Sequence, residues 1–216
     1  MWIVLKKTFK YNAVCLIFVV EHYFTRNPSS EMREKKIIVS FSRKKFTLIS
    51  SSGVFSKDKP DTASIILCEA AKSQISGKIL DMGCGYGLIG ICLLKFNPNL
   101  KITFSDVNER ALELTKKNLI LNKLKGEVIY SDGADNIKTK FDHVLLNPPM
   151  AAGRKICFKI INDAHNLLNN GGSLFVVARH QKGGKLIKEH MKEEFGNVND
   201  AARKAGFHVY VSKKVR

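Results

Sequence analysis

A glycine-rich turn between two apolar segments constrains the fold of this chain more than any other feature. Residues 78–82 predict a short strand, and residues 87–96 predict a helix. Gly83, Gly85 and Gly87 join them, and glycines let the backbone turn sharply and approach a ligand without a Cβ in the way. A strand, a glycine turn and a helix in this order predict the first unit of a nucleotide-binding α/β sheet.

Strand-like and helix-like segments alternate along the rest of the chain. The predicted strands cover residues 101–106, 127–130, 141–146, 173–178 and 207–211, and the predicted helices cover residues 108–121, 156–168 and 184–195. Such alternation predicts an α/β fold in which helices cover both faces of a parallel sheet. Ligands of these sheets bind beyond the carboxyl ends of the strands, so functional residues are expected directly after strands.

The segment before the glycine turn predicts smaller elements. Residues 37–41 and 46–50 carry β-branched and apolar side chains on either side of a basic stretch, residues 42–45. This pattern predicts a hairpin with a basic tip. Asp61 is placed to cap a helix that runs to about residue 73.

Acidic residues follow consecutive predicted strands. Asp81 can accept hydrogen bonds from the ammonium group of an amino acid, or it can order the glycine turn. Asp106 is placed to bind both hydroxyls of a ribose, and Asn108 is expected to cap the next helix. Asp132 can accept a hydrogen bond from an adenine amino group, or it can be an ordinary turn aspartate.

The sequence Asn147-Pro148-Pro149 follows the strand predicted over residues 141–146. Consecutive prolines fix the backbone and remove two N–H donors, which leaves the Asn147 side-chain oxygen and the Pro148 carbonyl as acceptors. The exocyclic amine of a base is a poor nucleophile, and two acceptors that hold both of its protons can aim its lone pair at a sulfonium methyl. Proximity contributes about 7–11 kcal/mol in well-oriented reactions. The amine proton can leave late, after the methyl group is transferred, so neither a metal nor a general base is required.

Two other interpretations of these motifs remain open at this point. Asn-Pro is also a turn dipeptide, so the motif can be a simple strand-end turn. Gly85-x-Gly87-x-x-Gly90 also fits the dinucleotide fingerprint of nicotinamide-dependent oxidoreductases. The chain shows no evident Ser/Tyr/Lys or His dyad for hydride transfer, and an oxidoreductase has no use for the Asn-Pro-Pro motif.

The charge of the chain indicates a polyanionic partner. Its 36 Lys and Arg against 19 Asp and Glu give a formal net charge of +17. Cations that neutralise phosphates release counterions and drive binding, which favours a nucleic acid, although a lysine-rich proteome or an acidic membrane has the same signature. Loop-flanking cations are candidate RNA contacts, and for any one of them an ordinary solvated charge is the alternative: Arg43, Lys44, Lys45, Arg154, Lys155, Lys182 and Lys185.

Cysteine spacing and the N-terminal residues bear on location and domain boundaries. The 5 cysteines include no CxxC pair, which predicts reduced thiols in a cytoplasmic protein without stable membrane association. The apolar run at residues 13–20 is too short to span a bilayer. We expect residues 1–20 to be an extra packed element or a misassigned start, and residues 21–216 to form a single domain.

The motifs together resemble a known family. Asp81-x-Gly83-x-Gly85-x-Gly87 with Asn147-Pro148-Pro149 resembles the class I S-adenosylmethionine-dependent methyltransferases. More narrowly, the chain is similar to the "methyltransferase small" group, which contains guanine-N2 methyltransferases of small-subunit ribosomal RNA. Three further segments add to this resemblance: residues 21–25, residues 52–56 and the basic loop at residues 148–154. Residues 52–56 look like a loop that closes over the cofactor.

The resemblance implies a Rossmann-like sheet of seven strands, the last one antiparallel. It implies S-adenosylmethionine as cofactor, with Asp106 on the ribose, Asp132 near the adenine and Asn147 on the target amine. The other residues expected around the cofactor are Phe55, Gly83, Cys84, Gly85, Gly87, Val107, Asn108 and Gly133. Many relatives stack an aromatic residue on the flipped base where this chain has Met150, so we expect stacking to come from elsewhere or to be weaker.

The resulting hypothesis is an N-methyltransferase that acts on a base in RNA, with guanine N2 of the small-subunit (16S-type) ribosomal RNA as the favoured target. Methylation of a protein glutamine or of adenine in DNA is the alternative with the same chemistry. A non-catalytic, basic RNA-binding module is the alternative from another class. The protein is expected to be a monomer or a homodimer.

Overall fold

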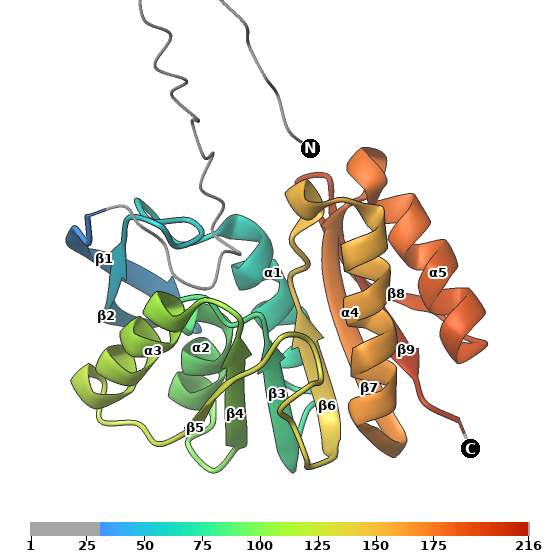
Figure 1. The fold of residues 1–216 in the computed structure, drawn as a ribbon, viewed down its shortest axis with the longest axis horizontal. Coiled ribbons are helices and arrows are strands. Elements are labelled where there is room, and N and C mark those ends of the chain that lie inside the picture. Colours follow the sequence, from blue (N-terminus) through green and yellow to red (C-terminus); the bar gives the residue numbers. More distant parts are fainter. Residues whose placement is uncertain (1–30, 216) are drawn as a thin grey trace, which may run out of the picture.

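The computed structural model describes residues 31–215, which form a seven-stranded sheet and a separate hairpin (Figure 1). The strands of the large sheet are β3 (Lys78–Met82), β4 (Lys101–Asp106), β5 (Glu127–Tyr130), β6 (Phe141–Leu146), β7 (Leu168–Arg179), β8 (Asn199–Lys204) and β9 (Phe207–Lys213). Their order is β5-β4-β3-β6-β7-β9-β8. Strands β3 to β7 pair in parallel, and β9 runs antiparallel to both of its neighbours. The predicted α/β class and the antiparallel last strand are confirmed.

Helices cover both faces of this sheet, and the pleat of the strands explains how. Helices α1 (Thr62–Ala71), α2 (Leu88–Phe96) and α3 (Glu109–Leu121) lie on one face, and α4 (Arg154–Leu167) and α5 (Lys185–Phe195) lie on the other. Successive side chains of a strand point to opposite faces. Accordingly, Phe175 and Val177 of β7 pack in the first layer, while Leu174 and Val176 pack in the second.

The hairpin consists of β1 (Glu34–Phe41) and β2 (Lys44–Ser51), and it packs on α3 at the end of the molecule away from α4 and α5 (Figure 1). Asn118 of α3 donates to the Ile49 carbonyl at 2.8 Å and accepts from the Ile49 amide at 2.6 Å. Asn122, one helical turn later, donates to the Thr47 carbonyl at 2.9 Å. The hairpin is confirmed, with longer strands and a shorter tip than predicted.

Helices α1 and α3 begin at the two predicted cap residues. The Asp61 side chain accepts from the Ser64 amide at the start of α1, and Asn108 accepts from the Ala111 amide at the start of α3. Both residues satisfy backbone N–H groups that a first helical turn leaves without a partner. They place the first turns of α1 and α3 at the carboxyl edge of the sheet, next to the glycine turn.

Two short segments also lie at this edge of the sheet, and the sheet differs from the prediction at β7 and at β8. The short helix η1 (Met150–Ala152) follows the Asn-Pro-Pro motif, and the kinked turn η2 (His180–Gly184) follows β7. Strand β7 begins at Leu168 instead of at the predicted residue 173, so it includes residues 169–172. The edge strand β8 was not predicted, since its sequence Asn-Asp-Ala-Ala-Arg-Lys has neither alternation nor β-branched residues.

Within residues 31–215, no helix is long and apolar enough to cross a membrane. The expectations for residues 1–20 and 21–25 lie outside the described residues.

Candidate active site

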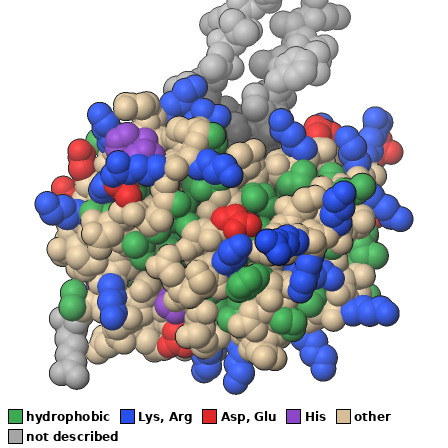
Figure 2. Space-filling view, turned by 180° about the vertical axis from the view of Figure 1, so that it is seen from behind, with side chains coloured by type: hydrophobic (Ala, Val, Ile, Leu, Met, Phe, Trp, Pro, Cys, Tyr) green, Lys and Arg blue, Asp and Glu red, His purple; other side chains and the backbone are tan. Residues whose placement is uncertain are grey.

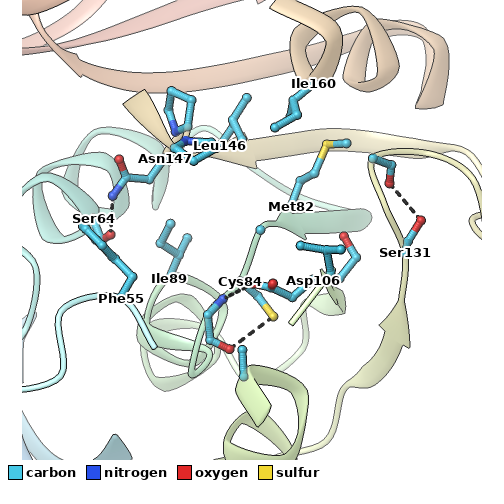
Figure 3. A pocket seen from close by; sticks show the side chains of 18 of the residues that line it. Phe55, Ser64, Met82, Cys84, Ile89, Asp106, Ser131, Leu146, Asn147 and Ile160 are labelled. Atoms are coloured by element: carbon cyan, nitrogen blue, oxygen red, sulfur yellow. Dashed lines mark hydrogen bonds between the residues drawn. The ribbon is translucent and has the colours of Figure 1, made fainter. Parts of the chain in front are cut away.

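A pocket of about 340 Å³ lies at the carboxyl ends of β3, β4, β5 and β6. Its two ends are chemically different (Figure 3): Asn147, Ser64 and Phe55 lie at one end, and Asp106 and Ser131 lie at the other. The volume falls within the range typical of small-molecule sites. The predicted functional edge of the sheet therefore carries a ligand-sized pocket.

The glycine turn forms the floor of this pocket. The amides of Gly83 and Cys84 donate to the Ser105 carbonyl at 2.8 and 2.9 Å, which ties the turn to the end of β4. Gly83 and Gly85 have φ values of 71° and 57°, and a Cβ on either would meet no atom within 4 Å. The space above these glycines is therefore open to a ligand. Gly87 also has a positive φ, but it starts α2 and does not line the pocket.

Asp81 lies beneath the turn rather than in the pocket. Its Oδ2 accepts from the Gly90 amide at 2.9 Å, and its Oδ1 has no partner among residues 31–215. Burial raises the pKa of this carboxyl to about 7. The geometry supports the role of Asp81 in ordering the glycine turn. Direct contact with an ammonium group, the other predicted role, would require Asp81 to line the pocket, and it does not.

Asp106 and Val107 line the pocket at the end of β4, as expected. The Asp106 carboxylate accepts from the Gly85 amide at 2.8 Å through Oδ2 and from the Asn108 amide at 2.9 Å through Oδ1. Desolvation raises the pKa of this carboxyl, and these backbone donors lower it in part. Asn108 itself is buried and caps α3, with its Nδ2 donating to the Gly53 carbonyl at 2.9 Å, so it supports the pocket from behind.

Asp132 and Gly133 line the same end of the pocket. The Asp132 carboxylate is exposed and lies 3.6 Å from the Lys159 ammonium of α4. A hydrogen bond to Asp163 raises the pKa of Lys159. Lys159 was not predicted for the site; it lines the pocket together with Ile156 and Ile160 of the same helix.

Asn147 lies at the opposite end of the pocket, and α1 holds its side chain. Its Nδ2 donates to Asp61 Oδ2 at 3.0 Å. It also donates to Ser64 Oγ at 3.0 Å (Figure 3). Its Oδ1 accepts no hydrogen bond from residues 31–215 and is not among their buried polar atoms without a partner. The amide therefore leaves its oxygen available to a ligand.

The backbone after Asn147 forms a tight turn. The Pro148 carbonyl accepts from the Met150 amide at 2.8 Å, and Pro149 has φ −74° and ψ 76°, as in an inverse γ-turn. A carbonyl oxygen has two lone pairs, so Pro148 retains capacity for one more donor. Pro148 and Pro149 both line the pocket beside Asn147.

The residues predicted for the substrate fall into three places. Met150 does not line the pocket; its sulfur lies 4.0 Å from Cys157 Sγ, and its methyl packs against Gly183 of η2. It therefore does not take the place of the stacking aromatic. Arg154 and Lys155 are exposed in the first turn of α4, close to the pocket residue Ile156.

Arg43 and Lys44 do not belong to the site. They lie at the hairpin tip, where Lys44 Nζ donates to the Lys95 carbonyl at 2.6 Å. Lys95 is in the last turn of α2, a helix that starts at the pocket and ends at the opposite edge of the sheet. The length of β2 carries the tip away from the pocket, so this placement does not support the predicted contact of these two residues with the RNA, which stays a prediction.

Tyr86, Asp61 and Ser64 are site residues that the sequence analysis did not identify as such. Tyr86 lines the pocket, and its buried hydroxyl has no partner among the described residues. Burial raises the pKa of this phenol. Asp61 was recognised only as a helix cap, and no sequence signal shows that α1 begins beside Asn147.

Comparisons with known proteins show which family this chain resembles. The family model "Methyltransferase small domain" matches residues 45–211. The chain is 35% identical over 199 residues to the Bacillus subtilis protein called "Uncharacterized protein YbxB". The matched region covers 90% of this chain and 99% of that protein. It is 36% identical over 171 residues to the "Ribosomal RNA small subunit methyltransferase C" of Haemophilus influenzae, across 77% of this chain and 51% of the relative.

The fold also matches a solved structure, the T. thermophilus 16S rRNA N2 methyltransferase RsmC in complex with AdoMet and guanosine. The TM-score is 0.73 at 24% identity, and the match covers 87% of this chain and 52% of that one. The chain thus spans about half the length of the ribosomal RNA methyltransferases it matches and nearly all of the B. subtilis protein.

Proposed function

The chain belongs to the methyltransferase small domain family, and on that premise we propose that it transfers a methyl group from S-adenosylmethionine to an exocyclic amine of a base in RNA. We propose guanine N2 of small-subunit ribosomal RNA as the target, because the relatives of H. influenzae and T. thermophilus are named for this chemistry or this RNA. One observation carries the proposal: Asn147, with its oxygen available, lines the same pocket as the open glycine turn.

The pocket fits S-adenosylmethionine, which supplies an electrophilic methyl group on a sulfonium when it is bound. The space above Gly83 and Gly85 allows close approach to the backbone, and the buried hydroxyl of the pocket residue Tyr86 has no partner among the described residues. We propose that Asp106, which lines the pocket, binds the ribose hydroxyls and that Asp132, which also lines it, binds the adenine amino group. Val107, Cys84, Gly133 and Phe55 complete the proposed cofactor contacts.

The chemical task of the other end is to hold an amine. We assign Asn147 Oδ1 and the free lone pair of the Pro148 carbonyl as acceptors for its two protons. An amine held in this way keeps its lone pair directed away from the two acceptors. The backbone of Pro148 and Pro149 is fixed by their rings and by the turn to Met150, so little order is lost when the base binds.

The proposed RNA partner is consistent with the charge of the protein. Lys and Arg side chains are spread over the face shown in Figure 2 and outnumber the acidic ones. At the carboxyl edge, exposed cations follow two strands: Arg154 and Lys155 lie in α4 after β6, and Lys182 and Lys185 lie in and directly after η2, which follows β7. We propose that these four cations contact phosphates of the RNA and that the protein acts in the cytoplasm, where ribosomal RNA is assembled.

Nucleoside mass spectrometry of ribosomal RNA from cells with and without the gene tests the proposal. We expect N2-methylguanosine in the small-subunit RNA to decrease when the gene is deleted and to return when it is restored. An unchanged nucleoside profile would rule out ribosomal RNA as the target. Calorimetry with S-adenosylhomocysteine then separates the remaining possibilities, because a protein or DNA methyltransferase binds it and a non-catalytic RNA-binding module does not.

A further inference from the structure

The first turn of α1 holds the side chain of Asn147 by both of its amide N–H groups. One N–H reaches Asp61 Oδ2 and the other reaches Ser64 Oγ, each at 3.0 Å. Asp61 Oδ2 also accepts from the Ser64 amide at 2.7 Å, so the oxygen that caps α1 also holds Asn147. Ser64 is buried, and both Asp61 and Ser64 line the pocket.

This arrangement decides which end of the asparagine faces the ligand. The two ends of an amide have nearly the same shape, and only their hydrogen-bond partners distinguish them. An ionised carboxylate can only accept, so the nitrogen of Asn147 must face Asp61. The oxygen is then turned away from α1, and it is the atom without a partner among the described residues.

We propose that Asp61 and Ser64 are positioning residues that fix the amide of Asn147 so that Oδ1, and not Nδ2, is presented to the target amine. This inference rests on the proposed function. In the opposite orientation, the amide would present its own N–H donors to the amine of the base. The two sets of donors would repel each other, and the amine protons would have no acceptor.

The Asp61 carboxylate has a second effect on the same site. A hydrogen bond from Nδ2 to a carboxylate polarises the amide and makes Oδ1 a stronger acceptor. The carboxylate also places a negative charge at the pocket end where the amine nitrogen becomes positive as it is methylated. Both effects stabilise the transition state, in which the nitrogen gains positive charge, more than the bound neutral amine, so they act on kcat more than on cofactor affinity.

A purely structural role for Asp61, as the cap of α1, makes a different prediction. Asn is as good an N-cap as Asp, so Asp61→Asn leaves the helix cap in place while it removes the charge and the fixed donor direction. We expect Asp61→Asn to lower kcat at least about tenfold, with the KM for S-adenosylmethionine and the melting temperature nearly unchanged. Asp58→Asn is the matched control, since Asp58 is an exposed carboxylate in the same loop that pairs with Lys35, and it should keep wild-type activity.

A swap of the two side chains tests the direction of the hydrogen bond. Asn147→Asp alone places two carboxylates against each other and should lose activity. In the double variant Asp61→Asn with Asn147→Asp, the amide at position 61 can donate to the carboxylate at position 147, whose other oxygen stays available to the amine. We expect this variant to be at least about tenfold more active than Asn147→Asp. The proposal is overturned if Asp61→Asn has wild-type kcat, or if the double variant is no more active than Asn147→Asp.

A spectroscopic readout keeps the test independent of turnover. The side-chain NH2 signals of Asn147 can be identified by their loss in Asn147→Asp, and they should exchange slowly with solvent in the wild type and shift in Asp61→Asn and Ser64→Ala. Signals that exchange as in an exposed asparagine, or that do not shift in these variants, would overturn the proposal. A wild-type protein that methylates no RNA would instead defeat the proposed function, while the NMR result would still report on the amide.

Discussion

At the scale of single residues, two carboxylates beneath and beside the glycine turn differ in what surrounds them. Asp106 accepts backbone hydrogen bonds through both oxygens at the pocket wall. Asp81 is fully buried, accepts one hydrogen bond from the Gly90 amide, and has an oxygen without a partner among residues 31–215. A buried carboxylate with one donor is costly to ionise, so Asp81 is a source of pH dependence within the fold.

Asp81 should make the stability of the protein fall as the pH rises. Burial raises its pKa from 3.8 in the unfolded chain to about 7 in the fold, so the unfolded state loses this proton first. The contribution of Asp81 is complete below pH 4 and is lost by about pH 7, which amounts to roughly 4 kcal/mol. Urea unfolding of wild type and Asp81→Asn between pH 4 and pH 8 measures it, and the variant should show the flatter profile. Parallel profiles would contradict the raised pKa.

The residue scale also shows which part of the site could be predicted. Asp106, Asp132 and Asn147 were identified because each lies at or just after the end of a strand, and the carboxyl ends of parallel strands meet at one edge. The contact of Asn147 with Asp61 joins residues 86 positions apart, and nothing local in the sequence encodes it. The position of Met150 could not be predicted, because its direction depends on the turn at Pro149 and on the position of Gly183 in η2.

At the scale of elements, α2 packs closely on β4, and this contact requires a glycine in α2. A Cβ on Gly90 would lie 2.2 Å from Cε1 of Phe104 and 3.1 Å from Cγ2 of Ile102. Gly90 is therefore needed for helix–strand contact, and its amide is also the donor to Asp81. The third glycine of the fingerprint serves packing here, while the open glycines Gly83 and Gly85 serve the ligand.

Gly90→Ala should destabilise the protein even though alanine favours helix formation. The overpacking against Phe104 is expected to cost about 1–3 kcal/mol, which exceeds the gain of about 1 kcal/mol in helix propensity. The midpoint of urea unfolding measures the change. Phe104→Leu in the same protein makes room, so the double variant should recover part of the loss; a Gly90→Ala variant as stable as wild type would show that α2 can move away from β4.

The elements themselves were largely predictable, for a reason that also explains the exceptions. Buried parallel strands and amphipathic helices have strong apolar patterns, which is why β3, β4, β5 and β6 have the predicted bounds. The edge strand β8 is held instead by its partner β9 and by the ion pairs of Asp200 with Lys188 and Arg203. Such an element depends on tertiary contacts, and its polar sequence has no apolar periodicity from which a strand could be predicted.

At the scale of the whole molecule, the proposed RNA surface is the carboxyl edge and not the whole basic exterior. The structure places Arg154 and Lys155 beside the pocket, and Arg43 and Lys44 at the opposite edge of the sheet. These two pairs have the same charge and similar exposure. They form a matched test of where the phosphates bind.

RNA binding should weaken steeply with salt, and only one of these pairs should contribute. Replacement of Arg154 and Lys155 by alanine removes two phosphate contacts, so the slope of log K against log salt should become less steep by about 1 to 2. The same replacement of Arg43 and Lys44 should leave the slope unchanged. Fluorescence anisotropy with a labelled ribosomal RNA fragment measures both slopes, and an equal effect of the two pairs would mean that the charge acts without a defined surface.

The most direct test of the account is the transfer of a labelled methyl group from S-adenosylmethionine to small-subunit ribosomal RNA by wild type and by Asn147→Ala. We expect the label in wild type to appear on the exocyclic amine of guanine. Asn147→Ala should lose about 100-fold in kcat while its affinity for S-adenosylhomocysteine, measured by calorimetry, stays the same. Full turnover by Asn147→Ala, or label on a ring atom or a ribose, would contradict the proposal that this side chain holds the amine.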